Sequence, residues 1–109
     1  VADSHINAYL RTKFALSDPG TTIKPYPEAV WAEMADSRTA PVALSLGLLD
    51  SLHERWLIVL TGVTASQWSQ TIQHPDRGPM TLDDVVAMYE WHSRHHLAHI
   101  TELRSREQW

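Results

Sequence analysis

The sequence predicts an all-α chain in which three long helices are joined by short helices and loops. Apolar residues recur three and four positions apart over residues 1–16, 41–60 and 82–105, which is the period of an amphipathic helix. Each proline lies outside these stretches or opens one of them. At 109 residues the chain has the length of one domain. Three helices leave apolar surface uncovered, and a fourth would close a bundle.

The first helix, residues 1–16, carries an apolar stripe at spacings of about one turn. The stripe comprises Ile6, Leu10 and Phe14, with Tyr9 alongside. The helical pattern is already under way at Val1, with neither an initiator methionine nor a capping residue ahead of it. We therefore expect residues 1–109 to form a single domain that is truncated at its N-terminus.

The connecting segments are marked by proline and glycine. Pro25 and Pro27 disfavour helix in the residues before them, so residues 21–26 are predicted to be extended. Pro27 suits the first turn of a short helix, which we place at residues 27–34. A second short helix is predicted from Thr64 to Trp68, and residues 71–80 form a loop or hairpin.

The other two long helices have clear starts. Pro41 opens the second, and Gly62 is a plausible stop. Its wide apolar face comprises Leu44, Leu48, Leu49, Leu52, Trp56, Val59 and Leu60. Thr81 and Asp84 resemble a capping box, with aspartate in place of the usual glutamate, so the third helix is expected at residues 82–105.

Composition excludes several classes of protein. The net charge is −4 and no basic run is present, which argues against a nucleic-acid partner. No apolar stretch approaches the length of a membrane span, and no signal peptide is visible. The chain has no cysteine, and therefore neither a disulfide framework nor a nucleophilic thiol of its own. We expect a cytoplasmic protein without membrane contact.

Four of the seven histidines lie in residues 91–100, where they form two pairs at four-residue spacing. The pairs are His92 with His96 and His95 with His99. Residues four apart share one face of a helix, so either pair could bind a single metal ion. The competing interpretation is a polar helix face that happens to be rich in histidine.

The helical period separates the two pairs. His92 and His96 lie on the apolar line of the third helix, which comprises Leu82, Val85, Tyr89, His92, His96, Ile100 and Leu103. His95 and His99 share a more solvated line with Glu102. Two neutral imidazoles are costly to bury without partners, and coordination would satisfy one nitrogen of each. The alternative is two core histidines that bond to backbone or carboxylate groups.

A third metal ligand must come from another helix. His5 is the candidate on the first helix, and its alternative interpretation is a histidine at the boundary of the core. His53 lies near Leu49 and Trp56 without a paired histidine, so it is better explained as a structural or surface residue. A site of two or three histidines with an open position is of the catalytic kind.

Four spaced segments resemble those of a known family. They are Val-Ala-Asp-Ser-His-Ile-Asn-Ala-Tyr at 1–9, Thr-Ile-Lys-Pro-Tyr at 22–26, Leu-His-Glu-Arg-Trp at 52–56 and Trp-His-Ser-Arg-His-His-Leu-Ala-His-Ile-Thr at 91–101. Together they resemble the DinB-like superfamily and, within it, the YfiT-like group of metal-dependent hydrolases, which is related to bacillithiol S-transferases. The resemblance covers nearly the whole chain.

The resemblance implies a four-helix bundle of up-down-down-up topology, with a divalent metal held by three histidines near one end. His92 and His96 match the pair on the last helix. Relatives carry a His-His pair directly before the segment that begins at Val1, so the family's first ligand and first bundle helix have no counterpart here. His5 is then a second-best third ligand.

The function expected from these observations is that of a metal-dependent hydrolase or thiol S-transferase, with zinc or nickel as the metal. Its partners would be a small-molecule electrophile and, for the transferase, a low-molecular-weight thiol. His95, His99 and Glu90 are expected to support the metal ligands, and Asn7, Tyr9 and Arg11 to contact substrate. The alternative is a non-catalytic helical bundle that binds a small molecule or partner.

Uncovered apolar surface predicts a homodimer.

Overall fold

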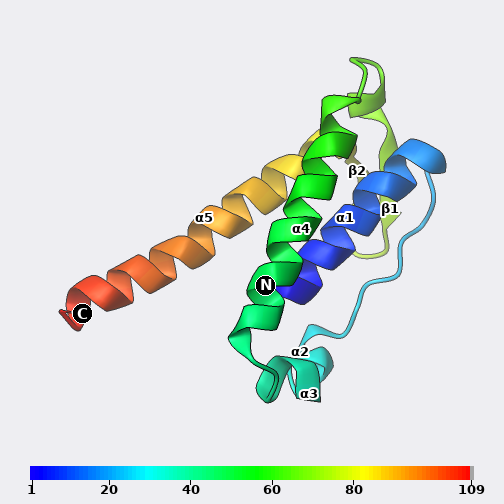
Figure 1. Cartoon of the computed structure of the whole chain (residues 1–109). Helices are drawn as coiled ribbons and strands as arrows, with labels where there is room; N and C mark the ends of the chain where they lie inside the picture. The colour runs from blue at the N-terminus through cyan, green and yellow to red at the C-terminus, as the bar shows by residue number, and fades with distance from the viewer. Residues whose placement is uncertain (109) are drawn as a thin grey trace.

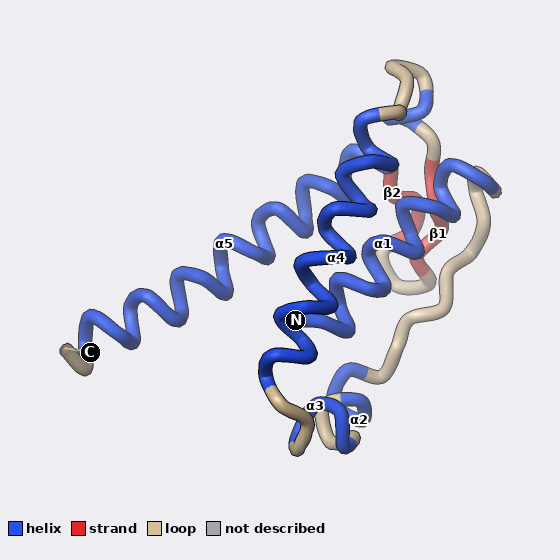
Figure 2. Tube along the Cα trace, in the orientation of Figure 1, coloured by secondary structure: helices blue, strands red, loops and turns tan. Residues whose placement is uncertain are grey.

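The computed structural model describes residues 1–108, and its three long helices agree with the predicted ones to within one residue at each end (Figures 1 and 2). The helix predicted from Thr64 to Trp68 is instead a 3-10 turn at Gln67–Ser69, and the one predicted at 27–34 is limited to Glu28–Trp31. The three long helices are α1 (Ala2–Ser17), α4 (Val42–Thr61) and α5 (Leu82–Arg106). The shorter elements are α2 (Glu28–Trp31), α3 (Ala35–Arg38), the 3-10 helix η1 (Gln67–Ser69), and the strands β1 (Thr71–His74) and β2 (Gly78–Thr81). The segment 71–80, predicted as a loop or hairpin, is therefore a hairpin.

Helix α1 contacts both α4 and α5, and the core lies where the three meet (Figure 1). The first half of α5 packs in this core, whereas its second half projects away from the other helices. The buried apolar residues are Ala8, Ala15, Ile23, Leu52, Trp56, Ile72, Met80, Leu82, Val85 and Tyr89. The core is therefore concentrated at one end of the molecule.

The prediction that the apolar stripe of α1 forms its buried face is wrong. Leu10 and Phe14 are 44% and 47% exposed, whereas Ala8 and Ala15 are completely buried. The small side chains let the backbone of α1 approach its neighbours closely, so that the helix packs through this face. His5, Arg11 and Thr12 are buried on the same side of the helix.

A side-chain hydrogen bond joins α1 to α4 inside this core. The indole Nε1 of Trp56 donates to Oγ1 of Thr12 over 3.0 Å, and the Thr12 hydroxyl in turn donates to the Ala8 carbonyl over 3.0 Å. Thr12 is fully buried and Trp56 nearly so. Both polar groups are satisfied, as the interior of a protein requires.

The hairpin caps the core and starts α5. Strands β1 and β2 are antiparallel, and each contributes one buried side chain, Ile72 and Met80 respectively. A bridge between Thr22 and Gln73 ties the extended segment after α1 to this hairpin. At the start of α5, Thr81 and Asp84 form the predicted capping box, with both reciprocal bonds at 3.0 Å.

Much of the apolar surface of α4 and α5 has no cover within residues 1–108. On α4 the exposed fraction is 66% for Leu44 and 44% for Leu48, so only Leu52 and Trp56 of the predicted face are buried. On α5, Leu97 and Ile100 are also exposed. Among the described residues, no helix is both long and apolar enough to cross a bilayer.

The buried bond between Trp56 and Thr12 leads to a test of stability. Thr12→Val keeps the shape of the side chain but leaves the indole N–H without an acceptor, so we expect unfolding to become easier by about 1–3 kcal/mol. Urea denaturation followed by circular dichroism would measure this loss.

Thr61→Val is the matched control, because the Thr61 hydroxyl also donates to a carbonyl one turn earlier, that of Leu57, but on an exposed face. Its effect should stay within about 0.5 kcal/mol. Equal losses in the two variants would show that the bond to Trp56 contributes nothing.

Candidate functional site

His92 and His96 lie one turn apart on α5 with their ring nitrogens facing each other. Nε2 of His96 is 3.0 Å from Nε2 of His92, and the ring centroids are 4.4 Å apart. Both side chains are half-buried, whereas His95 and His99 are exposed. The structure therefore agrees with the helical period on which pair faces inward.

His5 of α1 lies next to His92, one member of this pair. His5 is 2% exposed, and its ring centroid is 5.8 Å from that of His92. A hydrogen bond of 2.8 Å joins Nδ1 of His5 to Nε2 of His53 on α4. His5 thus connects two helices, and His53, predicted as a structural or surface residue, is exposed and bonded to His5.

Burial disfavours the charged form of these imidazoles. Burial, together with the neighbouring His53, lowers the pKa of His5 from 6.5 to about 4. Burial and the adjacent histidine rings likewise lower the pKa of His92 and of His96. Neutral imidazole is the form that binds a metal ion, because one ring nitrogen then carries a free lone pair.

The facing histidines fit a metal ion, although the described residues do not complete a site. Two imidazole nitrogens that bind one zinc ion at about 2.0–2.1 Å lie about 2.9–3.4 Å apart, which includes the spacing of His92 and His96. Buried Nε2 of His5 and Nδ1 of His92 have no hydrogen-bond partner. Within residues 1–108, however, no three histidine, aspartate or glutamate side chains are arranged to hold an ion.

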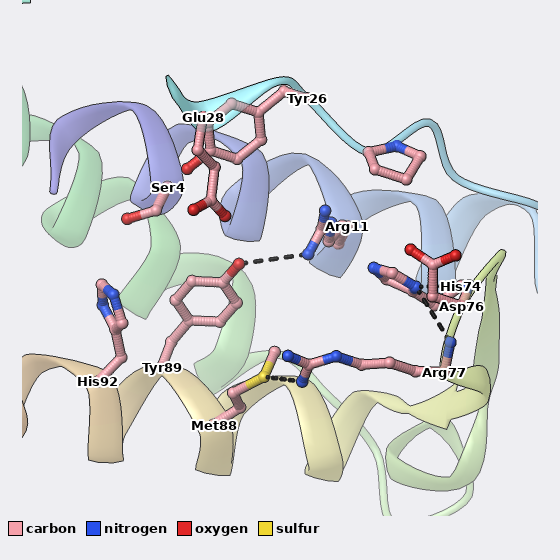
Figure 3. Close-up of a pocket in the computed structure, with 11 residues that line it drawn as sticks. Ser4, Arg11, Tyr26, Glu28, His74, Asp76, Arg77, Met88, Tyr89 and His92 are labelled. Carbon is pink, nitrogen blue, oxygen red and sulfur yellow. Dashed lines mark hydrogen bonds between the residues drawn. The ribbon is translucent and has the colours of Figure 1, made fainter. Parts of the chain in front are cut away.

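A cavity of about 400 Å³ opens beside His92, between α1, α5, the hairpin turn and the segment before α2 (Figure 3). Its lining is mixed in charge and contains Ser4, Arg11, Pro25, Tyr26, Glu28, His74, Asp76, Arg77, Met88, Tyr89 and His92. The cavity is large enough for a small molecule that would lie against the His92 ring.

Arg11 is the one predicted substrate contact that lines this cavity. Its Nη1 donates to the Tyr89 hydroxyl over 3.3 Å. Asn7 instead donates to the Asp3 carbonyl and borders a second hollow, which Arg11 also lines. The Tyr9 hydroxyl accepts a hydrogen bond from Arg55 on α4. The structure does not bring Asn7 or Tyr9 to His92.

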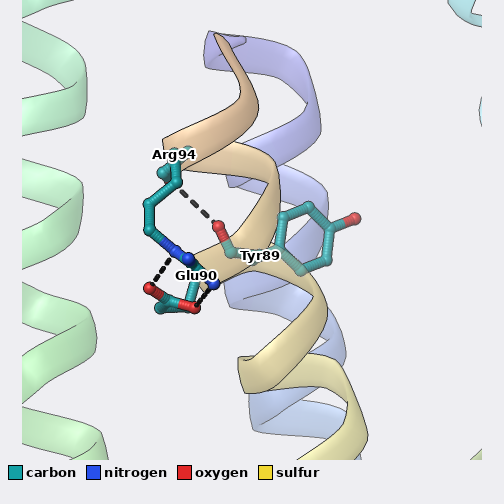
Figure 4. A network of polar contacts seen from close by, with 4 residues as sticks. Tyr89, Glu90 and Arg94 are labelled. Atoms are coloured by element: carbon teal, nitrogen blue, oxygen red, sulfur yellow. Dashed lines mark hydrogen bonds and ion pairs between the residues drawn. The ribbon is translucent and has the colours of Figure 1, made fainter. Parts of the chain in front are cut away.

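The residues predicted to support the ligands lie mainly on the outer face of α5. His95 stacks on Trp91 at 4.7 Å, and its ring edge meets His99 at 4.2 Å. Glu90 forms a two-pronged ion pair with Arg94, at 2.6 and 2.9 Å (Figure 4). Among the described residues, His95 and His99 touch the ring of His96, whereas the Glu90 carboxylate is engaged by Arg94.

Sequence reasoning missed most of the cavity. Tyr89 was placed in the core but given no functional role, and Arg77 and Glu28 were not singled out. These residues come from α5, the hairpin turn and α2, so only the tertiary fold brings them together. His74, in the segment predicted as a loop or hairpin, also lines the cavity, and no local pattern singled it out.

Comparison with known proteins identifies the family. The family model of the DinB superfamily matches residues 1–100. A protein of Bacillus pumilus (strain SAFR-032), named "Putative metal-dependent hydrolase", is 52% identical over 110 residues, and one of the same name in Bacillus cereus (strain ZK / E33L) is 49% identical over 109. Both alignments include 100% of this chain but only 62% of the relative.

A solved structure agrees with these matches. YfiT from Bacillus subtilis, described as "a probable metal-dependent hydrolase with an unusual four-helix bundle topology", superposes with a TM-score of 0.94 at 45% identity. The superposition covers 99% of this chain and 62% of YfiT. By sequence and by fold, the chain belongs to the DinB superfamily and has the YfiT-like helical-bundle fold.

Proposed function

We propose that this chain is the metal-binding part of a metal-dependent hydrolase. The observation that carries the proposal is the 3.0 Å approach of the two Nε2 atoms of His92 and His96 at the edge of a cavity. The names of relatives that are about half identical support the same activity. The chain spans 62% of the length of these relatives, so hydrolase activity is proposed for it and does not follow from the similarity alone.

His92 and His96 would hold the ion, with zinc or nickel as the metal, since imidazole suits both. When bound, a divalent ion lowers the pKa of a coordinated water or thiol and polarises an electrophile. His5 is the proposed third ligand, through its unpartnered Nε2, while Nδ1 keeps its bond to His53. Its ring would have to shift toward the pair, because no three described side chains are arranged to hold an ion. His95 and His99 would restrict the His96 ring through the contacts between the rings.

The more specific proposal is transfer of a thiol to a small electrophile. The chain has no cysteine, so the sulfur would come from a low-molecular-weight thiol such as bacillithiol. Hydrolysis would instead use water at the same position. A non-catalytic bundle that binds a small molecule remains the second candidate, and it is favoured by the shortage of a third converging donor within residues 1–108.

The choice of ligand pair predicts how variants bind metal. The His96→Ala protein should lose stoichiometric zinc, because one of the two facing nitrogens is gone. His95→Ala should keep it, because that ring lies on the exposed line. Elemental analysis after dialysis, with intact mass on the same sample, would measure the ratio of metal to protein. Zinc lost in His95→Ala but retained in His96→Ala would mean that we have chosen the wrong pair.

Activity should follow metal. We expect metal-dependent cleavage of an aryl ester, or thiol consumption with a haloarene, to fall at least tenfold in both His92→Ala and His96→Ala and on treatment with a chelator. The rate of ester cleavage compared with the rate of thiol consumption distinguishes a hydrolase from a transferase. Stoichiometric metal without either reaction, across several esters and haloarenes, would favour the non-catalytic bundle.

We also propose that the apolar faces of α4 and α5 are covered by a second copy of the chain. The exposed side chains there include Leu44, Leu48, Leu97 and Ile100, and they border one hollow with Ile6 of α1. Monomers rarely expose apolar patches beyond a few hundred Å². Light scattering at micromolar concentration should therefore show a dimer, and Leu48→Glu should dissociate it. A well-behaved monomer of the unaltered chain would refute this assembly.

A further inference from the structure

The cavity beside His92 holds two guanidinium groups from distant parts of the chain. Arg11 comes from α1, and Arg77 from the turn of the hairpin (Figure 3). Neither forms an ion pair with a carboxylate among the described residues, whereas Arg38, Arg94 and Arg106 do. Glu28 and Asp76 lie in the same cavity without pairing to either guanidinium, so both cations offer N–H donors to a bound anion.

Arg11 is the stronger indication because it is buried. Only 9% of the residue is exposed, and the hydrogen bond from its guanidinium within the described residues goes to a neutral phenol. A guanidinium offers five donors, and no nitrogen of Arg11 is among the buried side-chain atoms without a partner, so its remaining donors reach the open cavity. Its head lies at the cavity wall, facing the open space (Figure 3). A bound anion would satisfy donors that the chain leaves free.

Tyr89 adds a second donor at the same point. Its hydroxyl accepts the bond from Arg11, so its own hydrogen is free to donate toward the cavity. A phenol holds this hydrogen at neutral pH. Arg11 and Tyr89 together therefore present N–H and O–H donors side by side.

Arg77 lies across the cavity and is held only weakly. Its Nη1 donates to Sδ of Met88 over 2.9 Å, and a thioether is a poor acceptor. Glu28 and Asp76 also line the cavity, and they balance the two guanidiniums in formal charge. That balance favours a singly charged ligand group over a doubly charged one such as phosphate.

We propose that Arg11, Tyr89 and Arg77 form a subsite for the carboxylate of a small molecule, beside the His92 ring. A guanidinium matches the two oxygens of a carboxylate with parallel N–H bonds. The proposal relies on the proposed function only in identifying the carboxylate as part of the substrate. Binding of the carboxylate itself requires no metal, so it can be measured separately.

The test is a titration of the metal-free chain with benzoate, followed by ¹H–¹⁵N NMR at constant ionic strength. We expect saturable shifts at the residues that line the cavity, and binding at least tenfold weaker for neutral benzamide. Inorganic phosphate should bind more weakly than benzoate. Phosphate that binds more tightly than benzoate would overturn the assignment to a carboxylate.

Variants locate the binding. Arg11→Gln and Arg77→Gln should each weaken benzoate at least fivefold. Arg55→Gln is the matched control: it removes the same charge and the same kind of contact, a 3.3 Å bond to the Tyr9 hydroxyl, but on an exposed face away from the cavity. Unchanged affinity in both cavity variants, or an equal loss in Arg55→Gln, would overturn the proposal.

Two further measurements keep the result decisive. If Arg11→Gln fails to fold, two other variants replace it. Arg77→Gln changes an exposed residue, and Arg11→Lys keeps the positive charge but loses the planar pair of N–H donors of the guanidinium. His96→Ala should lose zinc but retain benzoate. Benzoate binding in a chain that never binds metal would uphold the subsite and refute the hydrolase. Stoichiometric zinc without benzoate binding would refute the subsite and leave the hydrolase to be decided by the activity assays.

Discussion

The site depends on the close packing of α1 between α4 and α5. Ala8 and Ala15 are fully buried, and their small side chains allow this approach. Once α1 is held there, Thr12 accepts the indole hydrogen of Trp56, and His5 meets His53 and His92. Larger side chains at the alanine positions would push the helices apart and separate these polar partners.

The same packing imposes an electrostatic cost that is met only in part. His5, Arg11 and Thr12 are buried on one face of α1, and each has a partner on another helix. Three buried side-chain atoms of the described residues remain without one, and they are Nε2 of His5, Nδ1 of His92 and Oε1 of Gln70. Buried polar groups are nearly always satisfied in native proteins, so the two unsatisfied histidine nitrogens mark a place where binding would supply what folding leaves open.

The histidine pair and the arginine subsite share a wall of the same cavity, because His92 and Tyr89 are neighbours on successive turns of α5. A substrate anchored by its carboxylate at Arg11 would therefore have its far end directed along α5 toward the histidines. Anchoring at a point away from the reacting atoms lets binding energy serve orientation. The proposed metal site and the proposed subsite would then act on one bound molecule.

Local rules alone predicted the three long helices, the capping box at Thr81 and the inward line of His92 and His96, because helical period and capping depend on residues a few positions apart. Tertiary structure decided which face of α1 is buried, and it chose the alanine face over the stripe of Leu10 and Phe14. It also decided that Arg11 meets Tyr89 and that His5 meets His53, since these partners are separated by 78 and 48 positions. No local pattern encodes such distant pairs, because they form only when packed helices bring the side chains together.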